Sequence, residues 1–98
     1  MKNDQEQLRQ AAHAYLRERQ WHEAEIAFTS LLGQDGEDED ALLGLAVALD
    51  RLGQYERMFE IAERAVQINA GSALAVACKA RALQRLERLS EAPSGNGR

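Results

Sequence analysis

A repeat of 34 residues organises this sequence. Trp21 and Tyr55 lie 34 positions apart, and other positions recur with the same spacing. The recurring sets are Leu8, Leu42 and Val76; Ala12, Ala46 and Ala80; and Tyr15, Leu49 and Leu83. A fixed period of this length is typical of arrays in which one structural unit stacks on the next. Because such arrays present extended surfaces to other molecules, the period favours a binding function over a catalytic one.

Apolar residues at helical spacing predict five helices. The expected ranges are 5–18, 22–32, 40–52, 56–68 and 72–89. Gly33 and Gly53 follow the second and third ranges and are expected to end those helices. Asp38 and Ser72, which are also 34 residues apart, are predicted to cap the N-termini of the third and fifth helices.

These residues resemble the tetratricopeptide repeat, a helix–turn–helix unit of 34 residues. The matching residues are Leu8, Ala11, Ala12, Tyr15, Trp21, Ala24, Phe28, Leu31 and Leu32 in a first unit, Leu42, Leu45, Ala46, Leu49, Gly53, Tyr55, Ala62, Ala65 and Val66 in a second, and Val76, Ala80 and Leu83 in an unfinished third. The resemblance implies an all-α fold, an α-solenoid of five helices in a right-handed superhelical stack. Two departures are Arg19, where the family favours glycine, and Met58, where a small residue is usual.

The register of the repeat predicts the organisation of the chain. The expected parts are a disordered N-terminus at 1–4, a first repeat at 5–38, a second repeat at 39–72, a terminal half-repeat helix at 73–90 and a flexible tail at 91–98. The only proline, Pro93, falls in the expected tail, which agrees with a helical fold.

The resemblance also implies a binding groove, because the first helix of each pair lines a concave surface in this family. By position, the expected protein-binding residues are Arg9, His13, Leu16, Arg17, Leu43, Gly44, Val47, Arg51, Leu74, Ala77, Arg81 and Arg85. They would form an apolar floor with arginines at its edge, and Gly44 would let a ligand backbone approach closely. A helix or peptide with apolar anchors and some acidic residues would fit this surface. Alternatively, Leu43 and Val47 complete a core beneath a partner subunit or a missing repeat.

The last expected helix begins with an apolar run. Residues 73–78 are apolar all round, whereas stacked arrays usually end in a polar capping helix. A second copy, a partner protein or further repeats are therefore expected to cover it. Two functions follow: a protein–protein interaction module acting as adaptor, scaffold or small chaperone, or a self-associating structural oligomer that uses this helix as its interface. Type III secretion chaperones are similar in size and repeat type.

Composition argues against several other classes of protein. Charged residues interrupt every apolar stretch, so no membrane contact is expected. The net charge of −4 disfavours nucleic-acid binding. Four of the 16 acidic residues lie at 37–40, and the remaining 12 equal the 12 basic residues in number. A single cysteine, Cys78, cannot form an internal disulfide and favours a reducing compartment, the cytoplasm.

The sequence carries no recognisable catalytic, metal or cofactor constellation. His13 and His22 are nine residues apart, and no pair of histidine and cysteine residues has the i, i+4 spacing that places two ligands on one helix face. The sequence has no motif that would set a nucleophile beside a base and an orienting group, as an active site requires. We therefore expect neither enzymatic activity nor a bound cofactor. Cys78 is interpreted as a small packing residue whose pKa Arg81 would lower modestly.

Overall fold

The computed structural model describes residues 2–96, with side chains described from residue 4 to residue 90. Within this range the secondary structure consists of α1 (Lys2–Arg17), α2 (Trp21–Gln34), α3 (Glu39–Arg51), α4 (Tyr55–Ile68) and α5 (Ala73–Asn96). The predicted all-α fold with five helices is therefore confirmed.

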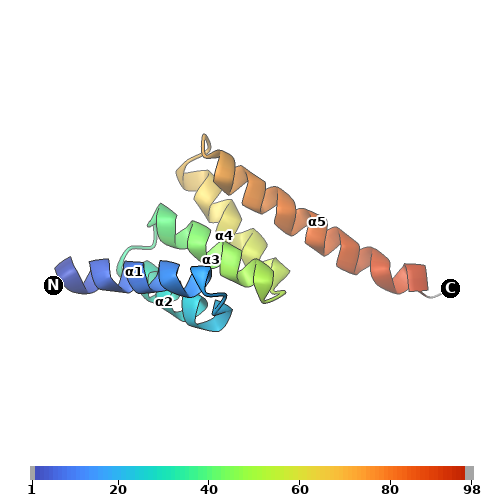
Figure 1. Cartoon of the computed structure of the whole chain (residues 1–98). Helices are drawn as coiled ribbons and strands as arrows, with labels where there is room; N and C mark the ends of the chain where they lie inside the picture. The colour runs from blue at the N-terminus through green and yellow to red at the C-terminus, as the bar shows by residue number, and fades with distance from the viewer. Residues whose placement is uncertain (1, 97–98) are drawn as a thin grey trace.

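The helices stack in the order in which they occur along the chain. Each helix packs against the next, and α3 also contacts both α1 and α5 (Figure 1). This pattern places α3 at the centre of the stack, with the pair α1 and α2 on one side and α5 on the other. The resulting molecule is elongated, with extents of 57 × 28 × 19 Å.

The core is built from a few large side chains set among alanines. The largest fully buried side chains are Phe28, Leu31, Leu42, Leu49 and Met58. Alanines with no exposed surface lie between them on α1 to α4: Ala12, Ala24, Ala41, Ala46, Ala48, Ala62 and Ala65. Small side chains at these contacts let neighbouring helices approach closely. No polar or charged residue among those described is buried, so apolar burial provides the main stabilisation.

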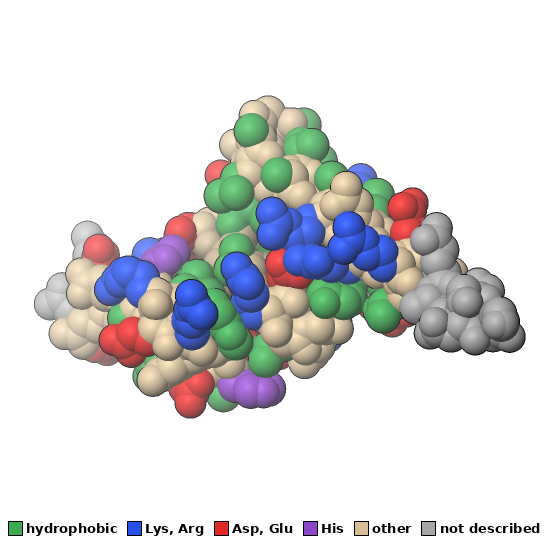
Figure 2. Space-filling model, turned by 45° about the vertical axis from the view of Figure 1, so that its right-hand side comes forward, with side chains coloured by type: hydrophobic (Ala, Val, Ile, Leu, Met, Phe, Trp, Pro, Cys, Tyr) green, Lys and Arg blue, Asp and Glu red, His purple; other side chains and the backbone are tan. Residues whose placement is uncertain are grey.

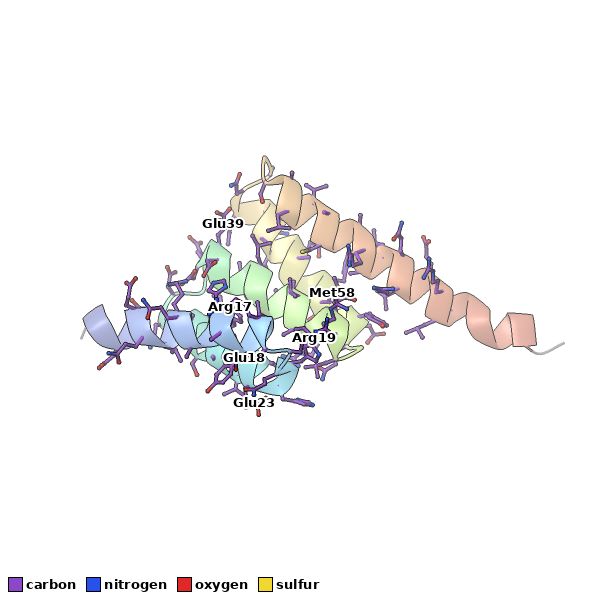
Figure 3. All side chains as sticks on the ribbon, in the orientation of Figure 1. Arg17, Glu18, Arg19, Glu23, Glu39 and Met58 are labelled. Carbon is purple, nitrogen blue, oxygen red and sulfur yellow. The ribbon has the colours of Figure 1, made fainter. Side chains whose placement is uncertain are left out.

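The same backbone turn ends α1 and α3. Arg19 and Gly53 occupy equivalent repeat positions and have φ values of 62° and 77°. In each turn the next residue donates a backbone hydrogen bond to a carbonyl five residues earlier, at 2.8 Å after Arg19 and 2.9 Å after Gly53. Figure 3 labels Arg17, Glu18 and Arg19 at the first turn. Glycine adopts this left-handed conformation without steric cost, so Arg19 is the strained member of the pair.

Both predicted N-caps are confirmed. The Asp38 carboxylate accepts a hydrogen bond from the backbone N–H of Ala41 at 3.1 Å, at the start of α3. The Ser72 hydroxyl accepts one from the backbone N–H of Ala75 at 3.1 Å, at the start of α5. These side chains satisfy backbone donors that the first turn of a helix leaves without an intrahelical partner.

Two helix boundaries near the N-terminal half differ from prediction. The expected disordered segment 1–4 is helical over residues 2–4, while Met1 lies outside the described residues. Asp4 in the first turn suits the positive end of the helix dipole, and extending a formed helix needs no new nucleus. Gly33 does not end α2, which continues to Gln34, because one glycine costs a helix only about 1 kcal/mol.

The C-terminal boundary is also wrong in the prediction. The helix expected to end near Leu89 continues as α5 to Asn96, so residues 91–96 of the expected flexible tail are helical. Only residues 97–98 of that tail lie outside the described residues. Pro93 lacks the backbone N–H that the interior of a helix uses, so one i→i−4 hydrogen bond is missing there. Glu91 and Ala92 before it are good helix formers, and α5 continues past the proline to Asn96.

Candidate functional site

A hollow lies between α3 and α5, on the side of the stack formed by the first helices of the repeats. It has a volume of about 250 Å³, and its lining consists of Val47, Asp50, Arg51, Met58, Leu74, Ala77, Cys78 and Arg81. Five of these residues were predicted to bind protein: Val47, Arg51, Leu74, Ala77 and Arg81. The structure thus brings together five of the eight predicted groove residues that α3 and α5 contribute; Leu43, Gly44 and Arg85 are not part of the lining.

Met58 is a lining residue that the sequence prediction did not assign to the site. It comes from α4, behind the two helices that form the walls, and is only 1% exposed. Figure 3 labels Met58 on the ribbon of α4. The signal was present in the sequence, because Met58 stands where a small residue is usual. A larger side chain at this position reaches between α3 and α5 and supplies a flexible apolar floor.

An aspartate at the edge of the hollow forms ion pairs with two arginines of α5. The side chain of Asp50 is 8% exposed, and its carboxylate lies 3.1 Å from Nε of Arg85 and 3.7 Å from Nη1 of Arg81. The Arg81 side chain remains 56% exposed. Arg51 and Arg81 are the two arginines that line the hollow, beside the one carboxylate of Asp50, and Arg85 binds that carboxylate from outside the lining. Figure 2 shows a group of Lys and Arg side chains beside hydrophobic ones near the middle of the face that it draws.

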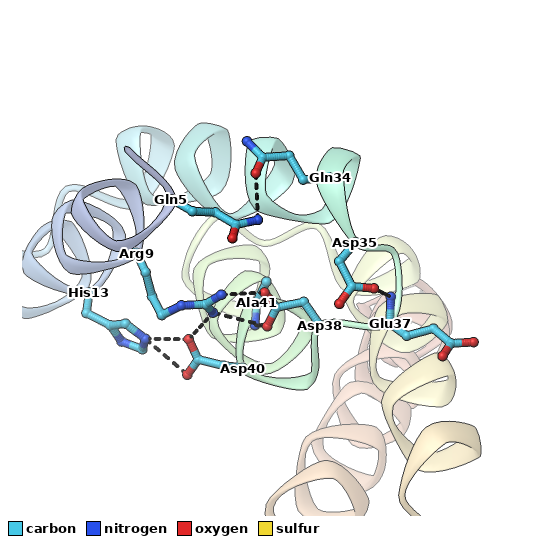
Figure 4. Close-up of polar contacts among 9 residues, drawn as sticks. All are labelled: Gln5, Arg9, His13, Gln34, Asp35, Glu37, Asp38, Asp40 and Ala41. Atoms are coloured by element: carbon cyan, nitrogen blue, oxygen red, sulfur yellow. Dashed lines mark hydrogen bonds and ion pairs between the residues drawn. The ribbon is translucent and has the colours of Figure 1, made fainter. Parts of the chain in front are cut away.

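The predicted residues from α1 have a different environment, which Figure 4 shows. Arg9 donates to Asp38 at 2.6 Å and to Asp40 at 2.9 Å, and Nε2 of His13 lies 2.9 Å from Asp40. The His13 ring also packs edge-on against Phe28, with centroids 5.1 Å apart. These contacts connect α1 to the beginning of α3. Arg9 and His13 therefore bind partners within the molecule, and neither lines the hollow between α3 and α5.

The ion pairs of this cluster shift the ionisation of its members. The hydrogen bond from Arg9 lowers the pKa of Asp38 below its usual range, against the opposing effect of burial. Burial acts to raise the pKa of Asp40, but hydrogen bonds from His13 and Arg9 outweigh it and leave that pKa lowered. The two carboxylates in turn raise the pKa of the Arg9 guanidinium. Both aspartates are therefore ionised at neutral pH.

Gly44 does not serve the purpose predicted for it. It is buried, and a Cβ atom at this position would lie 2.3 Å from Cζ of Phe28. The glycine makes room for the Phe28 ring between α2 and α3, so it is not a surface residue. Leu16 and Leu43 are half-buried and pack against the same core, whereas Arg17 is exposed.

No group of three His, Cys, Asp or Glu side chains in the described part of the chain could hold a metal ion. Burial raises the pKa of the Cys78 thiol, and the opposing effect of Arg81 is smaller, so the predicted lowering is wrong. None of the helices, as far as they are described, has the length and apolar character to cross a membrane.

Comparison with known proteins agrees with this architecture. The family described as "Anaphase-promoting complex, cyclosome, subunit 3" matches residues 17–94. Among solved structures, the chain is similar to the Yersinia enterocolitica type III secretion translocator chaperone SycD, in a crystal structure described as an alternative dimer. The identity is 25%, the TM-score is 0.81, and the match covers 95% of this chain and 70% of SycD. No curated protein matches. The predicted tetratricopeptide-type repeats are thereby confirmed.

Proposed function

Since the chain belongs to the anaphase-promoting complex subunit 3 family, with helix pairs of tetratricopeptide type, we propose that it is a non-enzymatic protein-binding module that holds a partner segment in the hollow between α3 and α5. The observation that carries this proposal is the combination of an apolar lining with an arginine edge. Val47, Leu74 and Ala77 offer apolar surface above the buried Met58, and Arg51 and Arg81 lie beside it.

The chemistry of the hollow specifies the kind of segment that would fit. Leu74 is 57% exposed and lines the hollow with Val47 and Ala77, so its apolar surface is accessible to a partner. An apolar side chain of the partner would lie against Leu74 and Ala77. An acidic side chain next to it would accept hydrogen bonds from Arg81, whose guanidinium is already oriented by Asp50. A short helix or extended peptide with this pattern satisfies both requirements.

The proposed contact surface is narrower than the groove predicted from sequence. Arg9 and His13 bind Asp38 and Asp40, and the Phe28 ring occupies the space next to Gly44. We therefore assign these three residues to stability, and the partner contacts to Val47, Arg51, Leu74, Ala77 and Arg81. Arg85 acts indirectly, because it neutralises part of the charge of Asp50.

The similarity to SycD supports a more specific role. SycD is a type III secretion translocator chaperone, and this chain shares its fold over 95% of its own length. We propose that this protein likewise protects a secretion-system subunit by covering an apolar segment of that subunit. The single cysteine agrees with action in the cytoplasm.

The experiment uses the only tryptophan of the chain as its reporter. Arg51, which lines the hollow, also lies over the Trp21 ring, so a bound segment that moves Arg51 changes the fluorescence of Trp21. The partner is first identified by affinity purification with mass spectrometry, and the purified partner is then titrated. We expect Val47→Glu and Leu74→Glu to abolish binding without loss of helicity.

Ile26→Glu provides the matched control. Ile26 is 67% exposed on α2 and borders a different depression, with Leu8 and Tyr15, so its substitution should leave binding unchanged. If Val47→Glu and Leu74→Glu bind the partner as tightly as the wild-type protein does, the proposed function is wrong.

A further inference from the structure

A depression between α1 and α2 lies apart from the hollow between α3 and α5. It has a volume of about 200 Å³, and its lining consists of Leu8, Tyr15, Glu23, Ile26, Ala27 and Ser30. We call these six residues the end groove. Figure 3 labels Glu23 on α2, on the side of the stack away from α5. Ile26 is 67% exposed, so the end groove presents apolar surface to solvent.

The second repeat has an equivalent groove, and there a helix fills it. Its residues Leu42 and Leu49 are fully buried. The equivalent residues of the first repeat, Leu8 and Tyr15, are only half-buried. α2, from the preceding repeat, packs against α3, and its Leu32 contacts the apolar cluster that contains Leu42. The place of α2 against the second repeat therefore indicates which kind of element the end groove accepts.

An ion pair helps to hold α2 in that place. Nη1 of Arg57, on α4, donates to the carboxylate of Glu25, on α2, at 2.6 Å. In the first repeat, Glu23 takes the position of Arg57. The charge at this contact is therefore reversed, and a helix in the end groove needs a basic residue where α2 has Glu25.

Two further differences make the end groove more apolar than its equivalent. Ile26 stands where the second repeat has Glu60, and Ser30 stands where it has Arg64. Glu23 is thus the only charged residue of the lining. It forms no ion pair within the part of the chain that the structure describes, so its carboxylate is available to a partner.

Neither the described helices nor a second copy of the chain suits this groove. α1 and α2 contact each other and α3, but neither of them contacts α4 or α5, so no described helix fills the groove. If α2 of a second copy lay there as α2 lies inside the molecule, its Glu25 would face Glu23. Two carboxylates in that arrangement repel each other.

We propose that the end groove binds an amphipathic helix of a partner protein. The helix lies as α2 lies against the second repeat, with apolar side chains toward Leu8, Tyr15 and Ile26. A Lys or Arg of the helix pairs with Glu23, which reproduces the internal ion pair of α2 and α4 with the charges exchanged. The end groove and the hollow are formed by different helices, so either can bind its partner without the other.

A peptide copy of α2 provides the probe. It has the sequence of residues 21–34 with Glu25→Arg, and a control peptide keeps Glu25. Titration into the isotope-labelled protein, followed by NMR, should shift the amide signals of the end groove and leave those of Leu74 and Ala77, in the hollow, in place. We expect the Glu25→Arg peptide to bind about threefold to tenfold more tightly than the control peptide, because an attractive charge pair replaces a repulsive one.

Variants of the protein separate the apolar contact from the charge. Ile26→Asn should weaken binding of the Glu25→Arg peptide at least about tenfold, because it removes apolar surface without adding a charge. Leu74→Asn is the matched control in the hollow and should leave this binding unchanged. Glu23→Arg should reverse the preference, so that the control peptide binds more tightly. Circular dichroism checks that each variant is folded.

Three results overturn the proposal. The first is the absence of shifts in the end groove up to millimolar concentrations of the Glu25→Arg peptide. The second is an equal affinity of the two peptides, or a preference that Glu23→Arg does not reverse. The third is a shift of the same amide signals when the protein is concentrated without peptide, which would assign the end groove to a second copy.

Discussion

The guanidinium of Arg51 lies 5.6 Å from the centre of the Trp21 ring, and the same contact recurs one repeat later. There, Arg85 lies 5.8 Å from the centre of the Tyr55 ring. Both rings begin the second helix of one repeat, and both arginines lie on the first helix of the next. The repeated aromatic position is therefore a contact between successive repeats, and it also positions two arginines beside the candidate binding surface.

Arg51→Ala is expected to lower the free energy of unfolding by about 0.5–1 kcal/mol, the usual contribution of an exposed cation–π contact. The same change should alter the emission spectrum of Trp21, because it removes the charge above the ring. Urea unfolding followed by circular dichroism and by fluorescence measures both effects. Arg17→Ala is the matched control: Arg17 has the equivalent repeat position, but no aromatic partner in the part of the chain that the structure describes. Equal losses for the two variants would contradict the assignment.

Arg19→Gly is expected to stabilise the protein, because Arg19 has a φ of 62° in a turn where the equivalent residue is glycine. The left-handed conformation costs a residue with a side chain about 1–2 kcal/mol, and the greater freedom of glycine in the unfolded chain offsets part of this gain. A net increase of up to about 1 kcal/mol should appear in thermal or urea unfolding. Gly53→Ala, at φ 77°, should have the opposite sign. A loss of stability in Arg19→Gly would show that its side chain contributes more than the strain costs.

Gly44→Ala is expected to destabilise the fold by about 1–3 kcal/mol, as overpacking of a dense core does. The added methyl group would meet the Phe28 ring at 2.3 Å, so ring and helix must move apart. A double-mutant cycle with Phe28→Leu tests the cause, since a smaller side chain at Phe28 should reduce the effect of the alanine. The coupling energy should reach at least about 0.5 kcal/mol, the lower end for residues in contact. If the losses of stability in Gly44→Ala and Phe28→Leu were strictly additive, the effect of the alanine would not come from its contact with the Phe28 ring.

Much of the fold could be predicted because the repeat constrains neighbouring positions together. The caps at Asp38 and Ser72 and the glycine turn at Gly53 are local features, each set by one residue and its adjacent backbone. The extension of α5 was not predicted because residues 91–98 combine proline, serine, glycine and asparagine, a composition typical of a tail.

The binding surface was less predictable, because position in a repeat does not reveal which side chains bind one another. Arg9 has the register of a groove residue, yet the acidic start of α3 lies within reach and engages it. Gly44 has the register of a surface residue, yet the ring of Phe28 from the preceding repeat fills its place. Both outcomes depend on contacts between residues distant in sequence, which periodicity alone does not specify.

The ion pairs of Asp38 and Asp40 with Arg9 are expected to make the protein sensitive to acid. Because both pKa values are lower in the folded protein than in the unfolded chain, the stability that they contribute is complete above the unfolded value of about 3.9. It is lost as the pH falls through the folded values, since the folded state must then take up protons. Most of the effect should come from Asp38, whose side chain is 11% exposed, because solvent screens Asp40 more strongly.

Urea unfolding between neutral pH and about pH 3 measures this dependence. Arg9→Met should lower stability at neutral pH and make the decline at acid pH less steep, because the aspartates lose the part of their pKa lowering that Arg9 provides, while the hydrogen bonds from the Ala41 N–H to Asp38 and from His13 to Asp40 remain. Arg64→Met is the matched control: it removes the same charge, but the partner of Arg64 is the backbone carbonyl of Gly36, which does not titrate. Its acid profile should therefore run parallel to that of the wild-type protein. A parallel profile for Arg9→Met as well would mean that the cluster between α1 and α3 does not set the acid stability of the fold.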